Sequence, residues 1–403
     1  MSSARRDAIF ALALWHIQGT FPAQSLRDSA HHSDALEIVG AALRKKSSLE
    51  WMLKQCVRRL PTGELWAALL AGAAQLLAMP GMAEHAAIAE TVEASKPIGR
   101  EAAKFVNAVL RRIQREKPRL LAALATQPEH LQRDIPRILW QRWCEAYGID
   151  RARAIADALA LPPQTCLRPL PFGAPPPDCA PHPEDPSGSF IVPRHSSVSA
   201  LAGYHEGHFV IQDVSTRHAV ELMSVQPGLR VLDACAAPGG KTAHLAARLG
   251  ANDRMIANEF SAARMDTLRD TLTRCRLLDR VTLCQEDATS ADFGTAFDRI
   301  LLDVPCSNTG VFGRRPDARW GWTPQKLRPL LQTQAALLDH ASGALRPGGW
   351  LVYSTCSIEP EENEGQIRAF LQRHPDFELG QTAQAFPSPL HDGAYACVLK
   401  RLR

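Results

Sequence analysis

Residues 231–242 read Val-Leu-Asp-Ala-Cys-Ala-Ala-Pro-Gly-Gly-Lys-Thr, and this stretch decides the fold of the second half of the chain. An apolar run, then small residues, then a helix-forming run predict a strand, a tight turn and a helix. In a doubly wound sheet, ligands bind beyond the carboxyl ends of strands, where the N–H groups that open the next helix are free. The turn is not a P-loop, because Cys235 stands where G-x-x-x-x-G-K-[ST] needs glycine, and it is not G-x-G-x-x-G either. We therefore predict a ligand-binding turn of a different kind.

Strand-like and helix-like runs alternate around this turn from about residue 209 onward. Strands are predicted at 230–233, 255–258, 281–284, 299–303 and 350–354, and helices at 241–249, 262–275, 324–344 and 361–373. Such alternation is typical of an α/β fold with a doubly wound, mostly parallel sheet and helices on both faces. The closing run 394–399 is expected to add an edge strand.

The first half of the chain has a different pattern. Residues 2–117 are rich in Ala and Leu, with apolar residues at helical spacing, and they predict an all-α domain. A second helical stretch is predicted at 131–161, with Trp140, Trp143 and Tyr147 expected to pack its core. Between residues 161 and 193 the prolines are too dense for a helix or a central strand, so we expect a linker or an irregular lobe. The predicted domains are 1–125, 126–208 and 209–403.

Composition excludes some classes of protein. The 403 residues are 45% hydrophobic, which is typical of a globular chain, and the ten cysteines include no Cys-x-x-Cys pair. A zinc ribbon is therefore not expected, and we predict no metal and a reducing, cytoplasmic location. The uncharged stretch 65–83 contains Gln75 and Pro80, which favours a buried core helix over a membrane span.

The formal net charge of +4 is too small to indicate a polyanionic partner, but charge is concentrated locally. Residues 100–119 hold seven basic side chains against two acidic ones. This density fits either a solvated helix face or a surface that contacts RNA phosphates. The basic residues are Arg100, Lys104, Arg111, Arg112, Arg115, Lys117 and Arg119.

Acidic and thiol side chains follow the predicted strands. Glu259 ends the second strand, where a carboxylate can accept both hydroxyls of a ribose, and Asp287 follows the third, where it could receive an adenine amino group. Asp303 and Cys306 follow the fourth strand and Cys356 follows the fifth. Each carboxylate taken alone is more often a cap, and a buried cysteine is ordinarily inert. Their shared register at one edge of the sheet indicates chemistry instead.

Four of these motifs occur together: Ala-Pro-Gly-Gly-Lys-Thr, Asn-Glu-Phe-Ser, Asp-x-Pro-Cys-Ser and Ser-Thr-Cys-Ser. They resemble the Sun-type family of RNA (cytosine-5)-methyltransferases, from about Gln212 through Glu364. Residues 85–93 and 104–112 look like the NusB-like helical domain that precedes the catalytic domain in bacterial small-subunit ribosomal RNA methyltransferases. The resemblance implies a Rossmann-like class I methyltransferase domain behind an RNA-binding all-α domain.

The resemblance also implies a mechanism, in which S-adenosylmethionine methylates C5 of a cytosine in small-subunit (16S) ribosomal RNA. Cytosine C5 is a poor nucleophile, so the reaction needs a thiolate that adds temporarily to C6. By resemblance, Cys356 is the nucleophile and Cys306 assists product release, although the residues alone would not rank the two. Asp303 is expected to bind the N3/N4 edge of the base, and Lys241 to stabilise charge or lower a thiol pKa.

The resemblance assigns the cofactor to the turn and the strand ends, with Glu259 where many relatives have Asp, and with Arg264 nearby. The predicted cofactor-binding residues are Cys235, Ala236, Ala237, Pro238, Gly239, Gly240, Lys241, Glu259, Asp287 and Asp303.

A base inside a duplex cannot reach such a site, so the target is expected to be unstacked. Phosphate contacts are predicted for Arg100, Lys104, Arg111, Arg112 and Arg115, and for Arg314, Arg315 and Arg319 near the pocket. We expect a monomer that binds ribosomal RNA and no membrane; the alternatives are a transfer RNA methyltransferase and a non-catalytic RNA-binding assembly factor.

Overall fold

The computed structural model describes residues 3–194, 196–250, 252–294 and 297–402, and the chain forms two compact units. Residues 1–162 and 312–321 form the first, called here the helical unit. Residues 163–311 and 322–403 form the second, called the sheet unit. The predicted lobe 126–208 is thus divided, because its helices belong to the helical unit and its strands to the sheet unit.

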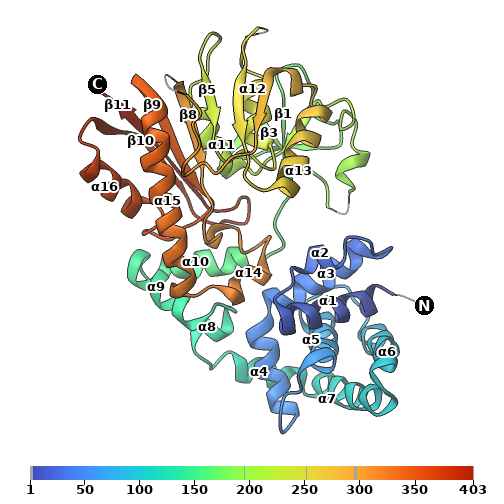
Figure 1. Ribbon diagram of the computed structural model, residues 1–403. Coiled ribbons are helices and arrows are strands. Elements are labelled where there is room, and N and C mark those ends of the chain that lie inside the picture. The colour runs from blue at the N-terminus through green and yellow to red at the C-terminus, as the bar shows by residue number, and fades with distance from the viewer. Residues whose placement is uncertain (1–2, 195, 251, 295–296, 403) are drawn as a thin grey trace. The chain divides into compact units, whose positions relative to one another are not determined.

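In the helical unit α1, α3, α4, α6 and α7 pack around α5, which is buried along almost its entire length (Figure 1). Its helices are α1 (Ala4–Gln18), α2 (Pro22–Ser25), α3 (His32–Arg44), α4 (Lys46–Cys56), α5 (Gly63–Leu77), α6 (Glu84–Ser95), the 3-10 turn η1 (Lys96–Ile98), α7 (Arg100–Leu124), α8 (Glu129–Gln132), α9 (Arg137–Tyr147), α10 (Ile149–Leu159) and α14 (Pro316–Gly321). No helix in the described part of the chain is both long and apolar enough to cross a membrane. The apolar stretch 65–83 contributes most of its residues to α5, whose side chains are mostly buried, so the predicted core helix is confirmed.

Two residues explain how α5 can be central. Gly72 lets α7 approach, since a Cβ at this position would lie 2.5 Å from Cδ1 of Leu110. Gln75 is buried, but its Nε2 donates to Thr91 Oγ1 at 3.1 Å and its Oε1 accepts from Arg5 Nε at 2.9 Å. A buried amide that is hydrogen-bonded in this way avoids most of its desolvation cost.

The predicted helical stretch 131–161 is three short helices, α8 to α10. Pro136 and Gly148 stand at the N-caps of α9 and α10, which explains the breaks. Trp140 and Trp143 are buried, so the expectation that they pack the core is confirmed, whereas Tyr147 is only half-buried.

The proline-rich segment contributes to a sheet, so the expected irregular lobe is wrong. A small antiparallel sheet has the order β2-β3-β1-β4, built from β1 (Cys166–Pro169), β2 (Ala180–His182), β3 (Asp185–Ile191) and β4 (Phe209–Ile211). Pro181 lies in the edge strand β2, Pro169 ends β1, and Pro186 is near the start of β3. Prolines are tolerated at such positions because few ladder hydrogen bonds are lost there.

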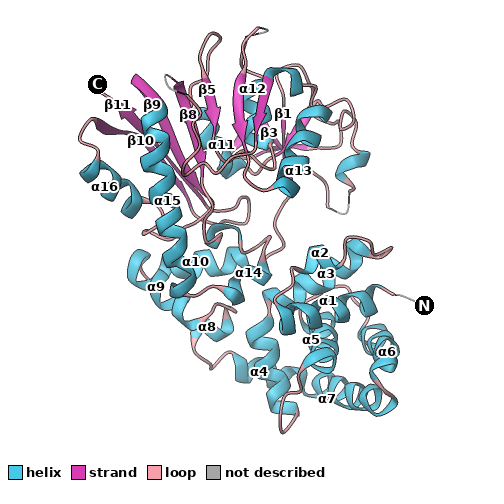
Figure 2. Ribbon diagram, in the orientation of Figure 1, coloured by secondary structure: helices cyan, strands magenta, loops and turns pink. Residues whose placement is uncertain are grey.

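The main sheet has seven strands in the order β10-β11-β9-β8-β5-β6-β7, of which β5 to β9 run parallel (Figure 2). Its strands are β5 (Val231–Asp233), β6 (Met255–Asn258), β7 (Val281–Cys284), β8 (Phe297–Asp303), β9 (Leu345–Thr355), β10 (Phe377–Ala385) and β11 (Ala394–Arg401). The predicted fold class is confirmed. The run at 394–399 is not an edge strand, however, because β11 pairs with β9 on one side and with β10 on the other.

Helices cover both faces of this sheet, and alternate strand residues face opposite ways. Val231 lies in the apolar core shared with α12 and α13, whereas Leu232 lies in the core shared with α15 and α16. The helices of this unit are α11 (Arg217–Leu222), α12 (Gly240–Ala246), α13 (Ala262–Arg274), α15 (Pro324–Ala344) and α16 (Glu364–Arg373), with 3-10 turns η2 (Val198–Ala200), η3 (Val214–Thr216), η4 (Leu278–Arg280) and η5 (Thr309–Val311). The strand order reverses between β5 and β8, so the loops that follow these strands diverge and leave a crevice.

Candidate active site

The turn after β5 lines a cavity of about 180 Å³ at this crevice. Gly239 has φ +102°, a left-handed conformation that glycine adopts without strain. The small side chains of the turn leave its backbone accessible. The cavity is lined by Ile211, Gln212, Asp213, Thr216, Asp233, Cys235, Ala236, Ala237, Pro238, Gly240, Lys241 and Asp303. Most of the cofactor-binding residues predicted from the sequence are therefore brought to one place.

The predicted site did not include Gln212, Asp213 or Thr216, which reach the cavity from the segment after β4. Gln212 is 6% exposed, and neither end of its side-chain amide has a hydrogen-bond partner among the described residues. An unpartnered buried amide beside a cavity is a group that a ligand can satisfy. The signal in the sequence was the polar pair Gln212-Asp213 directly after an apolar run, the same pattern as at the other strand ends.

Residues at the end of β6 form hydrogen bonds with the turn that follows β5. The buried Asn258 donates to Ala234 O at 3.1 Å and to Glu286 O at 3.0 Å, and so links the turn to the segment after β7. Glu259 is 4% exposed; it accepts from Ser261 N at 2.9 Å and forms an ion pair with Arg264 at 3.3 Å. Arg264 also donates to Ala237 O at 2.7 Å, which joins the acid at position 259 to the turn.

Asp287 is placed differently from expectation. It is exposed, and its Oδ1 accepts from the backbone N of Thr289 at 2.9 Å and from the hydroxyl of that residue at 2.7 Å. These bonds lower the pKa of the Asp287 carboxyl. The observed role is a loop cap, and its contact with an adenine group stays a prediction.

Lys241 and Asp303 form a close pair beside the cavity. Lys241 Nζ donates to Asp303 Oδ2 at 2.6 Å, and Ser354 Oγ donates to Asp303 Oδ1 at 2.7 Å. Burial lowers the pKa of Lys241, but the charge and hydrogen bond of Asp303 outweigh it, so the net pKa is raised. The site thus holds a charged ammonium and an oriented carboxylate.

The two predicted cysteines meet at the ends of neighbouring strands. Cys306 follows β8, Cys356 follows β9, and their Sγ atoms lie 3.2 Å apart. Cys356 Sγ donates to Asn308 Oδ1 at 3.2 Å. The hydrogen bond with Cys356, together with burial, raises the pKa of Cys306 well above its usual range. One of the two sulfurs is therefore held as a neutral thiol, and a proton can pass between them.

Cys235 has no such partner thiol, and burial raises its pKa, so it remains a neutral part of the turn. Among the described residues, no group of three His, Cys, Asp or Glu side chains is gathered as metal ligands.

The basic residues of α7 lie in the helical unit. Arg100, Lys104 and Arg115 are exposed and Arg111 is half-buried; at spacings of four, seven and four they share one side of the helix. Arg112 is also half-buried, and donates to Glu116 Oε1 at 2.9 Å and to Cys56 O at 3.2 Å.

The predicted phosphate contact of Arg319 is wrong. Arg319 is fully buried in the helical unit, where its guanidinium donates to Asp134 O at 3.0 Å and Leu159 O at 2.7 Å. Arg315 stacks on the Phe21 ring, with its guanidinium 3.8 Å from the ring centre. Arg314 and Arg315 are both part of the same segment 312–321, which belongs to the helical unit rather than to the sheet unit.

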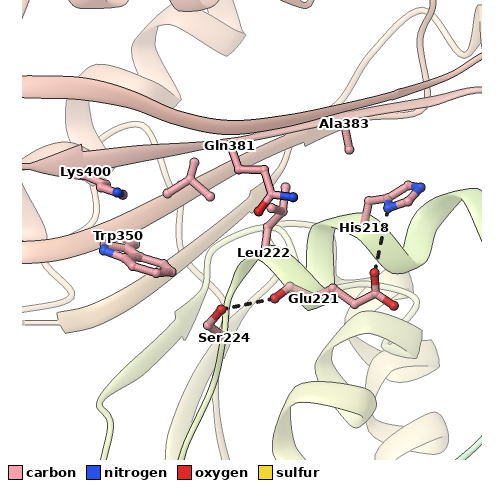
Figure 3. Close-up of a pocket in the computed structure, with 9 residues that line it drawn as sticks. His218, Glu221, Leu222, Ser224, Trp350, Gln381, Ala383 and Lys400 are labelled. Carbon is pink, nitrogen blue, oxygen red and sulfur yellow. Dashed lines mark hydrogen bonds and ion pairs between the residues drawn. The ribbon is translucent and has the colours of Figure 1, made fainter.

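A second cavity of about 240 Å³ lies on the sheet unit between α11 and strands β9 to β11 (Figure 3). His218 points toward Glu221 at 3.8 Å, while Trp350 and Lys400 reach in from the strands. It contains none of the predicted site residues.

A parallel sheet with a small-residue turn after its first parallel strand, an acid after the second and a cavity between them defines a class I methyltransferase fold. Comparison with known proteins identifies the family. The family model for 16S rRNA methyltransferase RsmB/F matches residues 220–395, and the NusB family model matches residues 2–115.

Individual relatives agree with these matches. The ribosomal RNA small subunit methyltransferase B of Salmonella typhi is 35% identical over 372 residues, which cover 86% of this chain and 83% of that protein. A methyltransferase homolog protein from Pyrococcus horikoshii has a TM-score of 0.59 and 25% identity, covering 68% of this chain and 97% of that one. The crystal structure of PH0851 has a TM-score of 0.79 with 23% identity over 100% of both chains, which shows the fold alone. The chain belongs to the 16S rRNA methyltransferase RsmB/F family and is a methyltransferase, as the four motifs predict.

Proposed function

We propose that this enzyme transfers a methyl group from S-adenosylmethionine to C5 of a cytosine in small-subunit ribosomal RNA, through a temporary bond between Cys356 and C6. The observation that carries the proposal is the pair of sulfurs 3.2 Å apart, at the ends of the two strands next to the Lys241–Asp303 pair. A thiolate at this position is the group that C5 activation requires.

The residues of the turn fit S-adenosylmethionine. On the side of the turn the cavity is lined by the small residues Ala236, Ala237 and Gly240, which leave the backbone within reach of a ligand. Glu259 is a buried carboxylate suited to ribose hydroxyls. When bound, the cofactor supplies an electrophilic methyl group on a sulfonium.

The residues of the chain then have distinct tasks. The Cys356 thiolate forms a bond to C6, and the electron pair of the C5–C6 double bond makes C5 nucleophilic. Asp303, fixed by Lys241 and Ser354, holds the N3/N4 edge of the base. After C5 has gained the methyl group, its proton passes to solvent, the electron pair of that C–H bond re-forms the C5–C6 double bond, and the Cys356–C6 bond breaks with its electron pair returning to sulfur as the thiolate. Cys306 assists this last step.

The ribosomal RNA substrate is supported by the relative from Salmonella typhi, a ribosomal RNA small subunit methyltransferase, and by the basic side of α7 in the NusB-matching region. The test is to incubate full-length protein with methyl-labelled S-adenosylmethionine and, in separate reactions, unmodified 16S ribosomal RNA or unmodified transfer RNA, then to analyse the nucleosides. We expect labelled 5-methylcytidine at one position, found by bisulfite sequencing, and none with Cys356→Ala. Label only in transfer RNA would favour the other substrate, and RNA binding without label would indicate an assembly factor.

A further inference from the structure

Glu362 is a fully buried carboxylate in the segment between β9 and α16. It accepts hydrogen bonds from the backbone N of Ser307 at 2.8 Å, from Gln334 Nε2 at 2.9 Å, and from the hydroxyls of Ser307 and Ser357. All these donors are neutral. Burying a carboxylate is costly even when it is hydrogen-bonded, so a neutral side chain would serve better if only packing were needed.

The donors show what the carboxylate connects. Ser307 directly follows Cys306, and Ser357 directly follows Cys356, so one side chain joins the residues after both cysteines. Gln334, which also donates to Pro305 O at 2.9 Å, fixes the first loop again from α15. The two cysteine loops are thereby held at a set separation.

The backbone of the loops is packed equally closely. Gly310 N donates to Cys356 O at 3.0 Å, and a Cβ at Gly310 would lie only 2.7 Å from the same oxygen. Tyr353 OH donates to Glu362 O at 2.7 Å, which fixes the segment that carries the carboxylate. The 3.2 Å distance between the sulfurs therefore depends on this network.

Charge is distributed unevenly around the two thiols. The charge of Glu362 adds to the hydrogen bond and burial that raise the pKa of Cys306, whereas the charge of Cys356 is among those that raise the pKa of Lys241. The Glu362 carboxylate thus acts on Cys306, the cysteine next to the Ser307 that it binds. The titratable groups that face the pair are Lys241, Asp303, Tyr353 and Glu362.

We propose that Glu362 is a positioning residue for methyl transfer: its carboxylate sets the separation of the two cysteine loops, and its negative charge keeps Cys306 as a thiol so that the thiolate forms on Cys356. The role of Glu362 in methyl transfer rests on the proposed function. Its effect on which of the two cysteines ionises does not.

The thiol preference is measured on the full-length protein without RNA or cofactor. Iodoacetamide is added across a range of pH, and mass spectrometry gives the alkylation rate of each cysteine. We expect Cys356 to react faster in the wild type, and Glu362→Gln to reduce the ratio of the two rates about tenfold, the change that one pKa unit produces. Glu362→Asp keeps the charge and should keep the preference, and Glu361→Gln, at an exposed neighbouring position, is the matched control.

Methyl transfer is measured on the same variants. Glu362→Gln should lower kcat with little change in KM or in cofactor affinity, and should shift the pH profile of kcat; Glu362→Asp should recover part of the rate. An unchanged alkylation ratio in Glu362→Gln, or an equal loss of preference in the Asp variant, would overturn the proposal. If the wild type transfers no methyl group, the proposed function fails, and the alkylation rates still decide whether Glu362 controls the thiols.

Discussion

Asp233 ends β5 with a buried carboxyl group, to which Thr242 donates at 2.8 Å on Oδ2. The hydrogen bonds from Thr242 and from the backbone of Cys235 act to lower the pKa of this carboxyl. Burial raises its pKa to about 7, with the charge of Asp303 adding to the effect. This carboxyl is therefore protonated in the folded state at pH values where the unfolded chain has already lost the proton.

The raised pKa of Asp233 makes the free energy of unfolding depend on pH. A carboxyl group whose pKa is raised by folding stabilises the folded state at pH values below its pKa in the unfolded chain. This stabilisation is lost as the pH rises toward 7, the pKa in the folded state. Relative to Asp233→Asn, the wild type should lose free energy of unfolding between pH 4 and pH 7, by on the order of 4 kcal/mol at most. Urea unfolding of both proteins at several pH values measures this, and a pH-independent difference would contradict it.

Arg319 is a second residue whose environment decides its role. Its two carbonyl acceptors in the helical unit would be left unpaired by Arg319→Ala. We expect a loss of about 3 kcal/mol in the free energy of unfolding, with unchanged salt dependence of RNA binding. Urea unfolding with Arg58→Ala, an exposed position, is the control. Weaker RNA binding at full stability would restore the phosphate role.

At the scale of the elements, two arginines of α7 can be compared to test whether this helix contacts RNA. Arg115 is exposed on the same side as Arg100 and Lys104, while Arg119, one turn further on, is paired with Glu116. If that side contacts phosphates, Arg115→Gln should reduce the slope of log affinity against log salt by about 0.7 to 0.9, the value for one contact. Arg119→Gln should leave the slope unchanged. Equal slopes for both variants and the wild type would remove α7 from the RNA-binding surface.

The sequence predicted the parallel strands well because each is a short apolar run between helices. It missed β10, whose residues are mostly exposed and include Gly380, so that no apolar run marks it. Pairing with β11 defines this strand, and pairing is a tertiary property. The same reason applies to β1 to β3, where prolines suggested irregular structure but occupy an edge or the ends of strands.

As with the fold, only part of the candidate active site could be predicted from the sequence. Residues at strand ends were found, because parallel strands bring their carboxyl ends to one edge of the sheet. Gln212 and Glu362 were missed, since their importance comes from burial and hydrogen bonding with residues distant in sequence. Arg319 was misassigned because nothing in the sequence shows that this basic residue lies in a short helix, α14, with its side chain buried.

At the scale of the whole molecule, the predicted domains, each a single continuous range of residues, do not describe the two units of the structure correctly. The segment 312–321 follows the loop of Cys306 in sequence, yet it belongs to the helical unit, so the chain passes between units after residues 162, 311 and 321. Likewise the net charge of +4 conceals a strongly basic stretch in α7. The place of segment 312–321 becomes visible only when residues are grouped by their positions in space, whereas the basic stretch is visible in the sequence once charge is counted segment by segment.

In the proposed mechanism Cys356 forms the bond to cytosine and Cys306 assists its release. The most direct measurement is denaturing gel electrophoresis of labelled 16S ribosomal RNA after incubation with S-adenosylmethionine and full-length Cys306→Ala or Cys356→Ala. We predict a covalent protein–RNA band with Cys306→Ala and none with Cys356→Ala. A band with Cys356→Ala alone would reverse the two roles, and no band with either variant would contradict the covalent mechanism.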